Sequence, residues 1–144
     1  MRVGSAVWRR VFCLCVLATL ALESGHLDEG RGALASVQGA GREGFLAPEI
    51  MRLEGELHLQ SGSPDIGAAE HWFVAAIDLA RRRQEKSLEL RAATSLARLR
   101  RQQNRDDDGR RAVADVYGWF TEGFDTVDLR NARTLLDELS APPR

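Results

Sequence analysis

The chain is poor in cysteine, and this scarcity excludes two classes of protein. Cys13 and Cys15 are its only cysteines among 144 residues. Two residues apart on a predicted helix, their side chains point in different directions, so a bond between them is disfavoured. No cluster of further cysteines or histidines supplies the four ligands of a structural zinc site. The sequence therefore predicts neither a disulfide framework nor a metal centre, and the two thiols fill space on a helix.

Net charge is also nearly absent, which argues against partners that are themselves highly charged. Twenty Lys and Arg residues against 21 Asp and Glu residues leave a net charge of -1. Arginine is dense at 81–83 and at 100–101, but acidic residues follow both runs at Glu85, Glu89 and 106–108. This mixture is typical of a solvated helix face. We expect no nucleic-acid partner and no stable insertion into a membrane.

Catalytic patterns are missing as well. The three histidines, His26, His58 and His71, are scattered. The acidic run 106–108 lacks the glycine and the distal glutamate of a calcium loop, and favourable placement at a helix start explains it more simply. No glycine-rich phosphate-binding loop ending in Gly-Lys-Ser/Thr occurs. We therefore expect a protein without catalytic activity, cofactor or bound metal.

Helix-forming residues are what the chain has in abundance. Leu, Ala, Arg and Glu dominate, β-branched residues are sparse, and 44% hydrophobic with 28% charged residues indicates a globular protein. Apolar residues recur at helical spacing, and no stretch alternates as a strand does. The glycines at 39, 41 and 44 predict a flexible connection. The pattern predicts an all-α protein with helices over about 6–23, 27–37, 48–60, 65–84, 87–103, 107–117 and 126–139.

The predicted helices repeat in pairs. When the second, fourth and sixth helices are aligned, apolar residues recur at separations of 39 and 40, and a column of small residues lies one turn earlier. Several columns in one phase indicate tandem helix-turn-helix units, each stabilised by stacking on its neighbour. We predict units over about 6–38, 47–84 and 87–118, a capping helix over 126–140, one domain over 1–140 and a tail over 141–144. The repeat positions are Leu34, Phe73 and Val113; Gly30, Ala69 and Gly109; Val37, Ala76 and Val116; and Leu17, Leu57 and Leu96.

The amino terminus permits two interpretations. Arg2, Arg9 and Arg10 precede an apolar run over 11–22, which is the layout of a secretory signal, but Glu23 interrupts the most natural cleavage site. The run is short for a transmembrane helix. The alternative is an internal packing helix, which the repeat pattern favours. We expect a cytoplasmic protein, or an exported one if Met1–Ser24 is a signal peptide.

The first unit resembles the tetratricopeptide pattern of large, small and turn residues. It presents Leu14, Leu17, Ala18, Ala21, Gly25, Gly30, Leu34 and Val37 at the family's spacing. The second unit keeps Ala69, Phe73 and Ala76, and the third keeps Leu96 and Ala97, with Asn104 at the turn and Gly109 in place of Ala. The resemblance implies a right-handed solenoid of about three helix pairs. Because the spacing of about 40 exceeds the 34 residues of that family, HEAT-like pairs are the structural alternative.

Three stretches resemble a more specific group. They are the runs 52–57, 79–93 and 116–126, the last reading Val-Tyr-Gly-Trp-Phe-Thr-Glu-Gly-Phe-Asp-Thr. Together they look like the carboxy-terminal tetratricopeptide tail of bacterial regulators that combine an adenylate or guanylate cyclase domain with an AAA-type ATPase domain. The resemblance implies a repeat region that senses or scaffolds a partner. The sequence contains neither a cyclase nor an ATPase domain, so those activities do not carry over.

Two sets of side chains are the candidate functional residues. Tyr117, Trp119, Phe120 and Phe124 are expected to plug the space between the last unit and the final helix, which Asp125 or Thr126 would cap. Exposed arginines of the odd-numbered helices, including Arg91 and Arg98, are expected to line a concave face for another protein or a peptide. The sequence thus predicts a protein-interaction or scaffold module.

Overall fold

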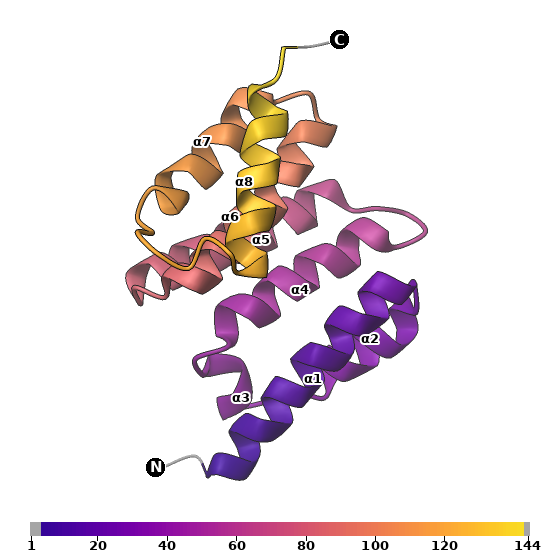
Figure 1. The fold of residues 1–144 in the computed structure, drawn as a ribbon. Coiled ribbons are helices and arrows are strands. Elements are labelled where there is room, and N and C mark those ends of the chain that lie inside the picture. The colour runs from indigo at the N-terminus through magenta and orange to yellow at the C-terminus, as the bar shows by residue number, and fades with distance from the viewer. Residues whose placement is uncertain (1–3, 143–144) are drawn as a thin grey trace. The chain divides into compact units, whose positions relative to one another are not determined.

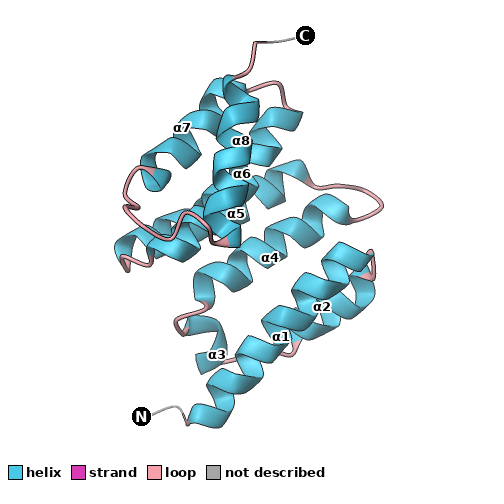
Figure 2. Ribbon diagram, in the orientation of Figure 1, coloured by secondary structure: helices cyan, strands magenta, loops and turns pink. Residues whose placement is uncertain are grey.

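The computed structural model describes residues 4–142, and those residues form α-helices without any strand (Figure 1 and Figure 2). The predicted all-α class is confirmed. All seven predicted helices are present, and their ends differ from the prediction by no more than two residues. The prediction of a flexible connection around 39–44 is wrong in part, because a short helix, α3, forms there. In chain order the helices are α1 (Ser5–Ser24), α2 (Leu27–Ala35), α3 (Ala40–Glu43), α4 (Ala47–Gln60), α5 (Ile66–Arg82), α6 (Lys86–Gln102), α7 (Asp106–Tyr117) and α8 (Val127–Ser140).

The helices fall into two compact units, residues 1–72 and 73–144. The boundary lies inside α5, between Trp72 and Phe73. The single domain expected over 1–140 stays a prediction.

The first unit is built on the helix pair α1 and α2, against both of which α4 packs. The pair forms because α1 ends at Gly25, whose φ of 78° is a left-handed conformation that glycine adopts without strain. There the N–H of His26 donates to the carbonyl of Ala21 at 2.8 Å. The core that results consists of Val11, Cys15, Ala18, Leu22, Ala33, Leu34, Val37, Ile50, Leu53 and Leu57.

The second unit repeats this arrangement with α6 and α7 as the pair and α8 packed against both. The turn after α6 places Asn104 at a φ of 59°, the left-handed conformation that asparagine tolerates better than most residues. The final helix, α8, contacts both members of this pair, and its role as the cap of an array stays a prediction. Its buried residues are Leu129, Ala132, Leu135 and Leu139, and those of α7 are Gly109, Val113 and Val116.

The small residues predicted at the helix crossings do allow close approach. A Cβ on Gly30 would lie 3.5 Å from Cβ of Ala21 and 3.8 Å from the carbonyl oxygen of Ala18, while one on Gly109 would lie 3.0 Å from the carbonyl oxygen of Ala97. The two crossings use equivalent residues, since Ala18 and Ala97 are separated by 79 residues, as are Gly30 and Gly109. That these pairs belong to a tandem array stays a prediction.

One predicted repeat position is wrong. Leu17 is 55% exposed, whereas Ala18 is fully buried. Successive helical residues are about 100° apart, so an alignment shifted by one residue turns a buried position outward. The column that the packing supports is Ala18, Leu57 and Ala97, with the same separations of 39 and 40 as the other columns. The other predicted positions are buried, namely Gly30, Leu34, Leu57, Ala69, Phe73, Ala76, Leu96, Gly109 and Val113.

Candidate interaction surface

The aromatic residues before α8 lie at the surface of the second unit. Trp119 is 59% exposed and Phe124 is 45% exposed, while Tyr117 and Phe120 are half-buried. The prediction of a buried plug is therefore wrong for Trp119 and Phe124. The physical reason is that Leu129, Ala132, Leu135 and Leu139 of α8 already occupy the interior, so the connection carrying the rings runs outside it. These four aromatic residues, Tyr117, Trp119, Phe120 and Phe124, are called the aromatic surface cluster below.

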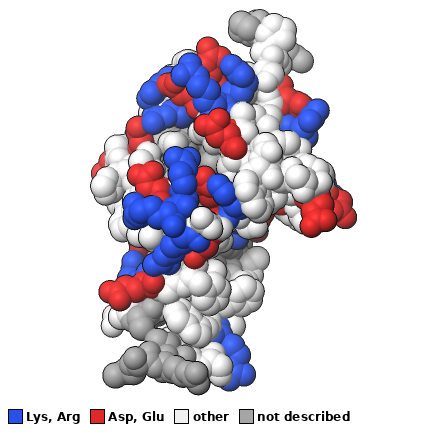
Figure 3. Space-filling view, turned by 90° about the vertical axis from the view of Figure 1, so that its left-hand side faces the viewer, with Lys and Arg blue, Asp and Glu red and all other residues white. Residues whose placement is uncertain are grey.

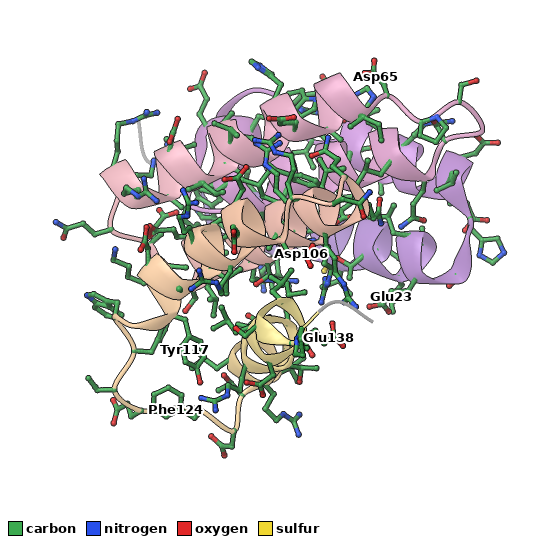
Figure 4. The ribbon with its side chains drawn as sticks, turned by 90° about the horizontal axis from the view of Figure 1, so that it is seen from above. Glu23, Asp65, Asp106, Tyr117, Phe124 and Glu138 are labelled. Carbon is green, nitrogen blue, oxygen red and sulfur yellow. The ribbon has the colours of Figure 1, made fainter. Side chains whose placement is uncertain are left out.

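The rings of this cluster contact each other in two pairs. Tyr117 and Phe124 have ring centroids 5.8 Å apart at an interplanar angle of 51°, and Trp119 and Phe120 are 5.2 Å apart at 88°. Both are the tilted or edge-to-face arrangements that aromatic rings prefer. Figure 4 labels Tyr117 and Phe124 where the chain leaves α7 and turns towards α8. Gly123, at a φ of 77°, permits that turn.

Cationic groups border the aromatic surface cluster. Nζ of Lys86 lies 5.9 Å from the ring centroid of Trp119, within the range of a cation–π contact. The negative charge of Asp137, and a hydrogen bond to that carboxylate, raise the pKa of the Arg133 guanidinium, and a hydrogen bond with Tyr117 raises it further. Lys86 is paired with Glu89 at 3.2 Å and Arg133 with Asp137 at 3.2 Å. The cluster thus combines exposed aromatic area with a border of paired charges.

The two arginines predicted to face a partner lie instead beside α8. Nε of Arg91 is 3.6 Å from Oδ1 of Asp128 in α8. Arg98 is exposed and lines a groove between α6 and α8 together with Arg101 and Glu138, which form an ion pair with each other. Part of the expected partner face is therefore covered by the chain's own final helix.

A second groove lies between the turn after α6 and the end of α8, and it is lined by the acidic run 106–108 with Arg105, Arg110 and Arg111. Its charges are paired locally. Arg105 contacts Asp108 at 2.8 Å, Arg110 contacts Asp107 at 3.7 Å and Arg111 contacts Asp108 at 3.9 Å. Figure 3 likewise shows basic and acidic side chains intermixed on the face that it displays. The run thus forms an acidic helix start in which Asp107 and Asp108 pair with nearby arginines.

Sequence analysis missed a buried charge pair in the first unit. Glu49 is 4% exposed and accepts two hydrogen bonds from Arg52, from Nη2 at 2.7 Å and from Nε at 3.0 Å. The i,i+3 spacing of the two residues on one helix was the available signal. Two bonds in this fork geometry satisfy both carboxylate oxygens, so the pair is a structural element of α4.

Metal-binding geometry is not found in the part of the chain that the structure describes. Among residues 4–142, no three His, Cys, Asp or Glu side chains are grouped so that they could hold a metal ion. Cys13 and Cys15 are both free thiols, the first exposed and the second buried. That the protein lacks catalytic activity stays a prediction.

Comparison of the chain with protein-family models, with curated proteins and with solved structures found no match.

Proposed function

We propose that this chain is a non-catalytic protein-interaction module, a tetratricopeptide-like right-handed solenoid of three helix pairs ending in a capping helix. The equivalent crossings at Gly30 and Gly109 and the shared separations of 39 and 40 support the tandem arrangement. The resemblance of the runs 52–57, 79–93 and 116–126 supports an origin in the repeat region of a cyclase and ATPase regulator. In that proposal the chain works in the cytoplasm as a sensor or scaffold.

The aromatic surface cluster is the observation that carries the interaction role. Exposed aromatic side chains grouped together are typical of protein-binding surfaces, and Trp and Tyr are enriched among the residues that dominate binding energy. Because the rings contact each other in two pairs, Tyr117 with Phe124 and Trp119 with Phe120, less conformational entropy is lost when a partner covers them. Because Lys86 is paired with Glu89 and Arg133 with Asp137, the exposed rings, and not the bordering charges, support this role.

Quantitative affinity purification from the native cell tests this proposal. The tagged chain, a Trp119→Ser/Phe124→Ser variant and a Val74→Ser control are compared. Val74 is also an exposed apolar residue of the second unit, at 38% exposure. The recovered amount of a specific partner should fall about tenfold or more with the double variant, because central aromatic anchors contribute about 2 kcal/mol or more to binding. The amount recovered with the Val74→Ser control should be unchanged.

The sequence-predicted face supplies a second arm of the same experiment. An Arg91→Glu/Arg98→Glu variant tests whether the groove between α6 and α8 takes part. A partner that is lost with this variant, and kept by the aromatic one, would move the binding surface to that groove. Recovery of the same proteins at equal amounts by every variant would contradict a specific interaction role.

An exported protein is the second candidate, and one observation favours it. By length and composition α1 qualifies as a membrane-crossing helix, with a mean hydropathy of 1.6 near the amino terminus, a property it shares with signal sequences and with core helices. Against export, Val11, Cys15, Ala18 and Leu22 of α1 form part of the core of the first unit. Amino-terminal sequencing of the mature chain distinguishes the two candidates: a start after Ser24 supports export, and a start at Met1 or Arg2 excludes cleavage.

A further inference from the structure

The outward face of α1 carries large apolar side chains exposed to solvent. Phe12 is 57% exposed, Val16 is 42% exposed and Leu20 is 53% exposed. Residues four apart lie on the same side of a helix, so the three form a single stripe. The opposite side of α1 is also apolar. Its residues Val11, Cys15, Ala18 and Leu22 are buried in the core of the first unit. A helix that is apolar on all sides normally has every side covered.

Charged residues bound this stripe, with opposite sign at its two ends. Arg9 precedes Phe12 by three residues, and Glu23 follows Leu20 by three. Both are exposed, and in the portion of the chain that the structure describes neither forms an ion pair. Along the helix the spacings are 3, 4, 4 and 3, so the positions of the stripe are spaced alike from either end, with Val16 at its centre.

From this symmetry we infer that two copies of the chain associate through α1, antiparallel about a two-fold axis at Val16. A two-fold interface must be self-complementary. If one residue of the first copy contacts a second residue of the other copy, the reverse contact forms as well. Antiparallel pairing places Phe12 against Leu20 of the other copy, Val16 against Val16, and Arg9 against Glu23. Parallel pairing would instead place Arg9 beside Arg9 and Glu23 beside Glu23. The sign of the charges therefore selects the antiparallel arrangement.

The same charges disfavour a lipid surface as the occupant. An interfacial helix carries cations along its polar border and lies on anionic headgroups. Glu23 would be repelled by those headgroups. A second copy satisfies both ends of the stripe, because each Arg9 meets a Glu23.

The contact is small, so the association is weak. Stable interfaces bury about 1,200–2,000 Å² in total, and one helix stripe per copy supplies less. We therefore expect dissociation in the micromolar range or above. This association involves no other partner and goes beyond the proposed function, so either one can fail while the other holds.

Sedimentation equilibrium over a concentration series tests the inference on the full chain. The charge reversals Arg9→Glu and Glu23→Arg each place like charges across the axis and should weaken dimerisation about three- to tenfold. The double variant restores opposite charges in swapped order and should return within about twofold of the original affinity. Val16→Glu brings two carboxylates together at the axis and should weaken the dimer more than tenfold.

Matched controls separate these effects from charge or folding alone. Arg10→Glu changes the net charge as Arg9→Glu does, but Arg10 lies about 100° around the helix, so its effect should be smaller. Circular dichroism should show unchanged helix content for every variant, since all altered side chains are exposed or half-exposed. A chain that stays monomeric at all concentrations overturns the inference, as does failure of the double variant to restore dimerisation. So does a monomer that binds phosphatidylserine vesicles through Phe12 and Leu20.

Discussion

Gly30 and Gly32 lie two residues apart in α2, and they should respond oppositely to the same substitution. A Cβ on Gly30 would lie 3.3 Å from Cδ2 of Leu57 and 3.5 Å from Cβ of Ala21, whereas a Cβ on Gly32 meets nothing within 4 Å. Replacing glycine by leucine inside a helix gains up to about 1 kcal/mol from backbone propensity at either position. At position 30 the added side chain overpacks the crossing of α1, α2 and α4, which costs about 3 kcal/mol or more.

Gly30→Leu should therefore lower the free energy of unfolding by about 2 kcal/mol, while Gly32→Leu should raise it by up to about 1 kcal/mol. Because both variants carry the same residue in the same helix, the helix-propensity contributions largely cancel when their free energies of unfolding are subtracted. The remaining difference between the two variants is about 3 kcal/mol. For a chain of this size that corresponds to roughly 6–12 °C in melting temperature. Thermal and urea unfolding, followed by far-ultraviolet circular dichroism, measure the difference. Two variants of equal stability would refute the close crossing at Gly30.

Three further predictions follow from the same packing. Ala18→Leu should destabilise the chain by about 1–3 kcal/mol, because Ala18 is fully buried. Leu17→Ala should change stability by less than about 0.5 kcal/mol. Urea titrations measure both changes, and the reverse order would restore Leu17 as the repeat position. Arg52→Ala leaves the buried Glu49 carboxylate without its forked donor and should cost about 3 kcal/mol. Arg133→Ala removes one partner of an exposed pair and should leave the urea midpoint almost unchanged, so equal midpoints for the two variants would contradict this. Cys13 is exposed and should react with a thiol reagent in the folded chain, whereas the buried Cys15 should react only on unfolding. Mass spectrometry of partly labelled protein identifies the modified cysteine, and labelling of Cys15 before Cys13 would contradict this prediction.

Helix positions and crossings could be predicted from the sequence because local signals specify them. Gly25 stops α1 through its left-handed conformation, and small residues at Gly30 and Gly109 mark where helices approach closely. Local signals do not specify which of two neighbouring apolar residues of a helix faces inward. Leu17 and Ala18 are both apolar, so periodicity alone does not decide which of them faces inward.

Long-range contacts account for what the sequence did not predict. The short helix α3 is held by Arg42, whose guanidinium donates to the carbonyls of Val37 and Leu34 at 2.6 and 2.9 Å and to Glu54 at 3.1 Å. No glycine-rich pattern reveals those partners. The aromatic rings around Trp119 were expected inside because their types are those of a core, but the residues of α8 occupy that space. Composition does not show which of two apolar groups fills a given volume.

The central claim, that this chain is a tandem array of equivalent helix pairs, can be tested directly by nuclear Overhauser measurements on isotope-labelled protein. The methyl group of Ala21 should show contacts to Gly30, and the β-protons of Arg100 should show contacts to Gly109, because Ala21 and Arg100 are separated by 79 residues, as are the two glycines. Contacts at only one of the two crossings would contradict the repeat.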